Sequence, residues 1–230
     1  MSYQFPNPVE ASDHVLALLD RLHRHSEAQE AGFDIYKHSA SASTFKEAVQ
    51  DKFIALDQDK CHCLYTLCRA LNAKNIVEAG TSYGVSTMYL GLAVTRNIEA
   101  TGGSGTVIGT EHETSKAERA RAYWAEAGEE VSRYIDLRVG DLRETLKSDL
   151  PAEIDLVLLD IWAPMTLPAL KLVQPKLRYG AVVVIDNPIA SADRYKDLLG
   201  YLRGRDSGFI NLTLPYNKGL EMSVYVPSRK

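Results

Sequence analysis

The sequence predicts an α/β fold in which a mostly parallel sheet carries helices on both faces and ends in an antiparallel hairpin. From Asn75 onward, short runs of apolar residues alternate with stretches whose apolar positions recur at helical spacing. Strands without a polar face that are separated by helices are typical of a buried parallel sheet. The final segment, FINLTLPYNKGLEMSVYVP, instead has two strand-like runs around an Asn-Lys-Gly turn, which predicts a hairpin.

The expected elements follow one another along the chain. Helical spacing marks residues 10–31 and 44–72, and the small, polar segment YKHSASAST between them predicts a loop or lid. The strand-like runs are NIVEAG, GTVIGTE, YIDLRVGD, IDLVLLD and GAVVVIDN. Further helices are expected at 86–98, 114–128, 141–149, 166–178 and 191–203. We therefore expect one domain, 1–230, with N-terminal helices and a substrate lid in 1–72 and the α/β core in 73–230.

The composition and net charge of the chain indicate which kinds of molecule it can bind. The chain has 230 residues, 45% of them hydrophobic, which suits one well-buried domain, and a net charge of −4. That charge offers no basic field for nucleic acid or anionic lipid, and no apolar run is long enough to cross a membrane. Because the N-terminus also lacks a secretory leader pattern, we expect a cytoplasmic protein that binds a small molecule.

A cluster of thiols at Cys61, Cys63 and Cys68, together with His62, raises the possibility of a zinc site. On a helix, Cys63 would point about 200° away from Cys61, so the four groups would not converge on one ion. We expect reduced, partly buried thiols instead.

An acidic residue ends each of the five strand-like runs that precede the hairpin. In an open parallel sheet, ligands bind beyond the carboxyl ends of the strands, at the point where the strand order reverses. Five acids gathered at that edge indicate a functional site. They are Glu78, Glu111, Asp141, Asp160 and Asp186.

The first of these turns, EAGTSYGVST, indicates the kind of ligand. Gly80 and Gly84 allow a close backbone approach and Ser86 opens a helix, but the third glycine of a dinucleotide fingerprint and the Gly-Lys of a P-loop are missing. A ligand with hydroxyls and positive charge suits the carboxylates better than a phosphate does. S-adenosylmethionine fits, with its ribose at Glu111 and its adenine near Gly140–Leu142. Because an acid in this position also binds the NAD ribose, an NAD-dependent oxidoreductase stays an alternative.

A second group of polar residues comes from two strands expected to be neighbours. Asp160, Asp186 and Asn187 offer oxygen ligands without histidine or cysteine, which suits a hard cation such as Mg²⁺. Alternatively, Asp160 caps the following helix and Asp-Asn-Pro is an ordinary turn.

With these residues considered, the chain resembles the cation-dependent class I methyltransferases of the catechol and caffeoyl-CoA O-methyltransferase group. The resemblance lies in LNAKNIVEAGTSYGVST, VIGTEHE, LLDIWAP and VVVIDN. It implies a Rossmann-like, seven-stranded sheet with a reversed last strand, and a Mg²⁺ ion held by Asp160, Asp186 and Asn187. It also implies a cofactor pocket lined by Glu78, Gly80, Ser86, Glu111 and Asp141. From their positions we add Thr81, His112, Gly140, Leu142, Asp160 and Trp162 to this pocket, although His112 could equally be an exposed loop residue and Trp162 simple packing.

The resemblance also implies a mechanism, from which this sequence departs at one position. The metal would bind two adjacent substrate oxygens and lower the pKa of one hydroxyl, with Asp160 as its first ligand. The family usually has a lysine three residues after that aspartate as the base, and here Ala163 takes its place. His38 and Lys218 are the candidates to substitute for it.

The leading hypothesis is therefore a metal-assisted O-methyltransferase acting on a catechol-like or other vicinal-oxygen molecule. A metal-independent methyltransferase, in which Asp160 and Asp186 position the substrate directly, is the second possibility. A non-catalytic protein that binds S-adenosylmethionine is the third, with Ala163 as the mark of lost chemistry. The long N-terminal helices could also pack on a second subunit to form a homodimer.

Overall fold

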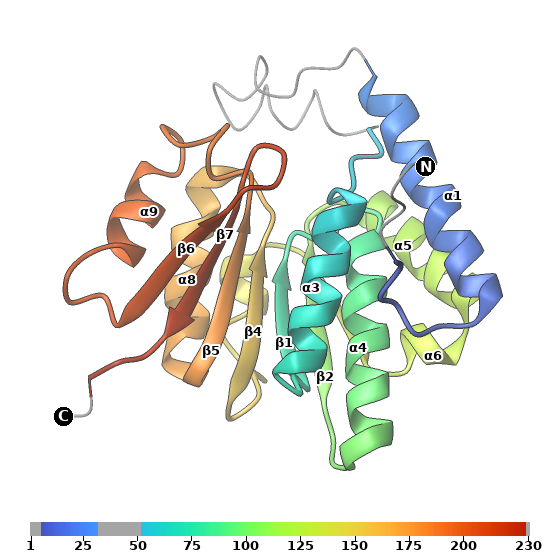
Figure 1. Cartoon of the computed structure of the whole chain (residues 1–230), viewed down its shortest axis with the longest axis horizontal. Coiled ribbons are helices and arrows are strands. Elements are labelled where there is room, and N and C mark those ends of the chain that lie inside the picture. Colours follow the sequence, from blue (N-terminus) through green and yellow to red (C-terminus); the bar gives the residue numbers. More distant parts are fainter. Residues whose placement is uncertain (1–5, 32–51, 229–230) are drawn as a thin grey trace.

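A computed structural model describes residues 6–31 and 52–228 (Figure 1). Its seven strands form one sheet in the order β3-β2-β1-β4-β5-β7-β6, in which β1 to β5 run parallel and β7 runs antiparallel to both β5 and β6. This confirms the predicted fold class and the C-terminal hairpin. The strands are β1 (Asn75–Ala79), β2 (Thr106–Glu111), β3 (Ile135–Val139), β4 (Ile154–Leu159), β5 (Leu177–Asp186), β6 (Phe209–Leu214) and β7 (Leu220–Tyr225).

Helices precede the sheet and connect its strands. They are α1 (Asp13–Glu30), α3 (Gln58–Ala70), α4 (Val85–Thr101), α5 (Thr114–Ala127), α6 (Glu129–Ser132), α7 (Leu142–Thr145), α8 (Thr166–Val173) and α9 (Lys196–Leu202), with the 3₁₀ turns η2 (Ala163–Met165) and η3 (Gln174–Lys176). In the part of the chain that the structure describes, none of these helices has the length and apolar character needed to span a membrane.

The helix predicted over 44–72 is wrong at its start. It begins at Gln58, and residues 52–57 form no helix because their backbone bonds to α1 instead. Ser26 Oγ accepts from the Ala55 amide at 2.8 Å and donates to the Phe53 carbonyl at 3.2 Å. Residues 44–51 and the predicted loop at 36–44, with His38, lie outside the described residues.

Three other predicted helices are shorter than expected. The one at 141–149 is the single turn α7, and the one at 191–203 begins only at Lys196. The helix predicted at 166–178 ends at Val173, where Pro175 is part of a 3₁₀ turn that leads directly into β5. Proline lacks the amide that an α-helix needs at an interior position, so the helix stops before it.

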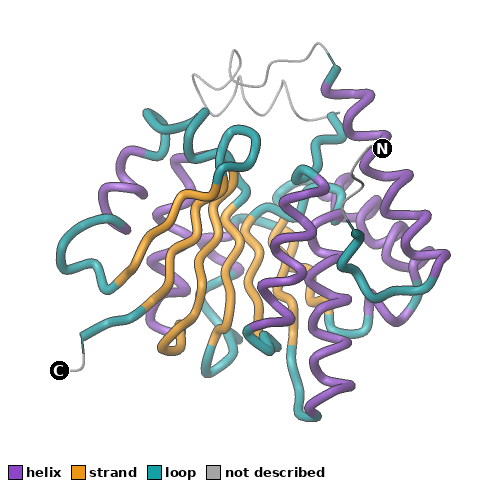
Figure 2. Tube along the Cα trace, in the orientation of Figure 1, coloured by secondary structure: helices purple, strands orange, loops and turns teal. Residues whose placement is uncertain are grey.

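Helices lie on both faces of the sheet (Figure 2), and an apolar cluster packs on each face. Along β4, Leu156 and Leu158 pack with residues of α1, α3 and α4, whereas Val157 and Leu159 pack with residues of α8 and α9. Successive strand side chains point to opposite faces, so a strand buried on both faces must be apolar throughout. Polar groups are consequently left to the strand ends, where the connecting loops form the site.

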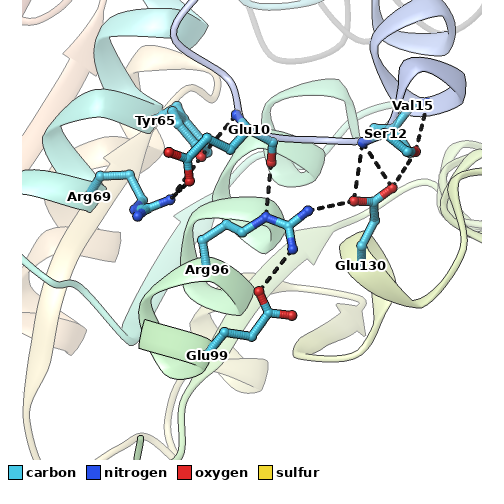
Figure 3. Close-up of polar contacts among 8 residues, drawn as sticks. All are labelled: Glu10, Ser12, Val15, Tyr65, Arg69, Arg96, Glu99 and Glu130. Carbon is cyan, nitrogen blue, oxygen red and sulfur yellow. Dashed lines mark hydrogen bonds and ion pairs between the residues drawn. The ribbon is translucent and has the colours of Figure 1, made fainter. Parts of the chain in front are cut away.

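The segment before α1 is fixed to the helices beside it by a group of polar contacts (Figure 3). Arg96 of α4 donates from Nε to the Glu10 carbonyl oxygen at 3.1 Å and from Nη2 to Glu130 Oε2 at 2.8 Å. Arg69 of α3 pairs with the Glu10 carboxylate at 2.6 Å, and the Ser12 hydroxyl donates to Glu130. These contacts bind the N-terminal segment to α3 and α4 and so help to hold α3 against the rest of the domain.

Candidate functional site

The turn between β1 and α4 brings the backbone close to the end of β4. Gly80 has φ 96°, and a Cβ atom on it would lie 2.1 Å from the Asp160 carbonyl oxygen, so only glycine fits. Gly84 precedes α4 in the left-handed region (φ 78°), and a Cβ there would lie 2.6 Å from the Trp124 ring. The Trp124 Nε1 donates to the Gly84 carbonyl at 2.9 Å. Packing and backbone geometry together therefore fix the shape of this turn.

Glu78 supports the turn from below. Its side chain is fully buried and accepts hydrogen bonds from the hydroxyls of Thr81 at 2.9 Å, Ser86 at 2.6 Å and Thr87. Burial raises the pKa of this carboxyl, and the three hydroxyl donors oppose that rise. Glu78 is not among the residues that line the cavity described below, so its placement differs from the prediction that it lines the cofactor pocket.

The ends of β2 and β3 provide the next polar groups. Glu111 accepts from the Ser82 amide at 2.7 Å and from the Glu113 amide at 2.8 Å, one on each carboxylate oxygen. Asp141 caps α7 and pairs with Arg143 at 2.5 Å, and this pairing lowers the pKa of Asp141 to about 2. Both carboxylates are therefore fixed in direction, and Asp141 is already neutralised by an arginine.

A cavity of about 510 Å³ runs along the carboxyl edge of the sheet. It joins the ends of β2 and β3 to those of β4 and β5, across the turn after β1. The structure brings together here all the predicted site residues except Glu78. The predicted residues that line it are Gly80, Thr81, Ser86, Glu111, His112, Gly140, Asp141, Leu142, Asp160, Trp162, Asp186 and Asn187.

At the end of β4, Asp160 faces this cavity. Its amide donates to the Ala79 carbonyl at 3.0 Å, and no described residue donates a hydrogen bond to its carboxylate. Burial, together with the charges of Asp186 and Glu78, raises the pKa of Asp160 well above its usual range. Ala163 is buried at the start of η2 and lines the cavity without a polar group. Asp160 is thus a carboxyl with a strong tendency to take up a proton.

Two of the three predicted metal ligands, Asp186 and Asn187, contact an ammonium group instead. Lys60 of α3 is 1% exposed, and its Nζ lies 2.6 Å from Asp186 Oδ1, 2.9 Å from Asn187 Oδ1 and 3.1 Å from Asp57 Oδ2. Burial alone would lower the pKa of Lys60, but the charge and hydrogen bond of Asp186, with those of Asp57, outweigh it and raise that pKa. The lysine is therefore charged, and each of its three N–H donors has an oxygen acceptor.

This group of residues is a poor fit for Mg²⁺. Their oxygens are of the right kind, but two of the three predicted ligands, Asp186 and Asn187, already accept from Lys60. A divalent ion about 4 Å from the ammonium would be repelled by about 8 kcal/mol at an effective dielectric constant of about 20. Among the described residues, no group of three or more histidine, cysteine or acidic side chains is arranged to hold a metal. The arrangement does not fit the ion.

Sequence reasoning missed Lys60, although a signal was available. Lys60 and Leu64 are four residues apart and so share one face of α3, and Leu64 is 1% exposed. A lysine on the buried face of an amphipathic helix needs an acidic partner, which one of the acids at the strand ends could supply. The thiols beside Lys60 are the more conspicuous feature of this sequence, but Cys61 and Cys68 lie buried in the core.

Several cationic residues line the cavity. Lys116 comes from α5, with its Nζ 5.5 Å from the centre of the Tyr83 ring. Arg194 comes from the segment before α9, and Lys218 from the hairpin turn. Lys218, one of the two suggested substitutes for the missing base, is thus placed at the cavity.

Part of the chain matches a known protein family. Residues 77–188 match a family described as "Methyltransferase domain". A curated relative, "Catechol O-methyltransferase" from Mycobacterium tuberculosis, is 29% identical over 150 residues. That match covers 65% of this chain and 64% of the relative, which is less than two thirds of its length.

Solved structures resemble the whole chain more fully. The O-methyltransferase TomG from Streptomyces achromogenes, in complex with SAM, has a TM-score of 0.66 at 22% identity and covers 95% of this chain and 92% of its own. Cofactor-bound Rv0187 from MTB has a TM-score of 0.67 at 24% identity, with 98% and 100% covered. These likenesses show the fold. These findings support the resemblance found in the sequence: residues 77–188 match a methyltransferase domain, and the chain shares its fold with O-methyltransferase structures.

Proposed function

We propose that this chain transfers the methyl group of S-adenosylmethionine to a hydroxyl oxygen of a small molecule. The observation that carries the proposal is the continuous cavity of about 510 Å³, with Glu111 at the β2 end and Asp160 at the β4 end. A cavity of this size is typical of small-molecule sites. Because one space includes both ends, a cofactor at the first and an acceptor at the second can meet within it.

The cofactor would lie across the ends of β1, β2 and β3. Each Glu111 oxygen accepts one backbone N–H and keeps lone-pair capacity for a ribose hydroxyl. The turn at Gly80 leaves room for the methionine part, and Gly140–Leu142 would border the adenine. The positive sulfonium and ammonium groups would lie near carboxylates, which favours them over a phosphate ligand.

The acceptor would lie against the ends of β4 and β5, and Asp160 would act as its base. The acceptor oxygen forms its bond to the methyl carbon as the bond from that carbon to sulfur breaks, and the hydroxyl proton passes to the Asp160 carboxylate. Asn187 also lines this end, so two neighbouring acceptor oxygens would each have a polar side chain nearby. This arrangement, and the name of the mycobacterial relative, support a catechol-like acceptor.

The test combines a binding measurement with a product screen. Calorimetry measures the affinity for S-adenosylhomocysteine, and mass spectrometry detects methylated products from catechols, monophenols and hydroxy acids, with EDTA or with Mg²⁺. We expect Glu111→Ala to weaken cofactor binding at least about tenfold, since it removes charge-assisted hydrogen bonds. Asp160→Asn should bind the cofactor and lose product formation.

A matched control and two contrary outcomes complete the test. Asp136→Asn, at an exposed ion pair on β3, should change neither readout. Cofactor binding without product on any acceptor would indicate a binding protein, and fluorescence quenching by NADH without binding of S-adenosylhomocysteine would indicate an oxidoreductase.

We also propose, from the sequence prediction, that the chain forms a homodimer. α1 buries its apolar face within its own chain, so the contact surface would have to lie elsewhere. The edge strand β6 exposes Ile210 and Leu212, which supplies an apolar strip. Light scattering of the purified protein gives the mass in solution; a monomer at all accessible concentrations contradicts the proposal.

A further inference from the structure

We propose that the ammonium of Lys60 takes the place of a divalent cation in this site, so that methyl transfer here needs no added metal. The inference rests on the proposed function for its catalytic part only. Its structural part concerns which cation the acidic group at the ends of β4 and β5 accepts, and it can be tested without any substrate.

The argument begins with the geometry of Lys60. Its three N–H donors have three oxygen acceptors, at 2.6 Å on Asp186, 2.9 Å on Asn187 and 3.1 Å on Asp57. These acceptors come from the end of β5 and from the residue that precedes α3. The lysine side chain is fully buried, so water does not compete for these bonds. An ammonium held by three oxygens in a buried site is costly to displace, because its donors would lose their partners.

The same contacts disfavour a second cation. A metal ion at Asp186 and Asn187 would have to share oxygens that already accept from Lys60, and it would bring further positive charge next to a buried ammonium. Asn187 is held in turn, since its Nδ2 donates to Asp186 Oδ2. Both side chains are therefore committed to the lysine and to each other.

Lys60 acts as a positioning residue, because it does not line the cavity. It neutralises Asp186 and orients Asn187 from beneath, and both of these residues line the cavity. Asp160, which receives no hydrogen bond from the described residues, then remains the carboxylate available to the acceptor. Lys60 thus supplies the fixed positive charge without occupying space in the cavity.

The first experiment measures metal binding directly. Electron paramagnetic resonance counts free Mn²⁺ during titration of the full-length wild-type protein and of Lys60→Ala, whose alanine opens the space and frees the oxygens. We expect the wild type to leave Mn²⁺ free at millimolar concentrations and Lys60→Ala to bind one ion at least about tenfold more tightly. The double variant Lys60→Ala with Asp186→Asn should lose that binding, which locates the ion.

The wild-type measurement alone can overturn the proposal, even if Lys60→Ala fails to fold. Tight binding of one Mn²⁺ ion by the wild type, abolished by Asp186→Asn, would mean that Lys60 yields its place to a metal. Circular dichroism checks the fold of each variant. Lys60→Arg, which keeps the positive charge, should still leave Mn²⁺ unbound. If Lys60→Arg binds Mn²⁺ as tightly as Lys60→Ala does, the charge of Lys60 has no role in excluding the ion.

The second experiment measures activity on the acceptor found by the product screen. Wild-type protein passed over a chelating resin should keep its full rate in EDTA, and Mg²⁺ should raise it less than about twofold, since the fixed cation is already present. A rate that disappears in EDTA and returns with Mg²⁺ would overturn the proposal. If no acceptor is found, the proposed function fails while the Mn²⁺ titration still decides the role of Lys60.

Discussion

Replacing Glu78 with leucine should weaken both the fold and cofactor binding. The substitution leaves the hydroxyls of Thr81, Ser86 and Thr87 buried without their acceptor. Each unsatisfied group costs about 1–3 kcal/mol, and removal of the buried carboxylate, which was costly to desolvate, offsets part of the total. We expect a net loss of about 2–4 kcal/mol in the free energy of unfolding.

Two assays separate the effects on the fold and on the site. Urea unfolding followed by far-ultraviolet circular dichroism gives the free energy of unfolding, and calorimetry gives the affinity for S-adenosylhomocysteine. Affinity should fall at least about tenfold, because Thr81 and Ser86 line the cavity and lose their support. Glu78→Gln should cost less, since its amide oxygen still accepts and its amide nitrogen can donate to a rotated hydroxyl.

Glu221 provides the matched control. It is equally buried, accepts from Arg203 at 2.9 Å and from the Thr213 hydroxyl, and lies away from the cavity. Glu221→Leu should therefore destabilise the protein by a similar amount and leave the cofactor affinity of the folded protein unchanged. If Glu78→Leu unfolds at the wild-type urea concentration, or if both variants lose affinity equally, our reasoning about the turn is refuted.

Three further predictions concern pH and the turn. Burial lowers the pKa of His23 from 6.5 to about 4, so the unfolded chain takes up this proton at a higher pH than the folded protein does. The free energy of unfolding should therefore fall by about 3 kcal/mol in all as the pH drops through this range. Urea midpoints measured at several pH values should depend less on pH for His23→Gln than for the wild type. Gly84→Ala should lower the free energy of unfolding by about 2–4 kcal/mol through its positive φ and a clash with Trp124, and an unchanged urea midpoint would contradict this. In pH profiles of kcat/KM, the apparent pKa of the acid limb should lie above the ordinary range of an aspartate. Asp160→Asn should abolish this limb and lower kcat/KM about 10²- to 10⁴-fold. A limb that is unchanged in this variant would show that Asp160 is not the base.

Much of the fold could be predicted because its signals are local. The apolar runs that became β1 to β5, and the Asn-Lys-Gly turn before β7, indicate strands from neighbouring residues alone. The start of α3 could not be predicted in this way. Phe53 and Ala55 form hydrogen bonds with Ser26, more than 25 residues earlier in the chain, and these bonds hold in a non-helical form a segment that has helical spacing.

The residues of the candidate site could likewise be predicted only in part from the sequence. Gly80 and Glu111 could be assigned to it because parallel strands place their carboxyl ends at one edge. Glu78 was assigned to the same edge, yet its side chain points beneath the turn, where three hydroxyls enclose it. Position at a strand end determines where a residue lies, but the neighbouring side chains determine which way it faces.

The sequence by itself determined the order of strands and helices, the glycine turn and the acids at the strand ends, because periodicity and turn chemistry act between near neighbours. Only the tertiary structure decided which positive group lies beside the acid at the end of β5. Lys60 and Asp186 are 126 residues apart, and their contact depends on how α3 packs beside the sheet. A buried carboxylate needs hydrogen-bond donors or a positive partner. For Asp186, the packing of α3 brings the Lys60 ammonium within hydrogen-bond distance.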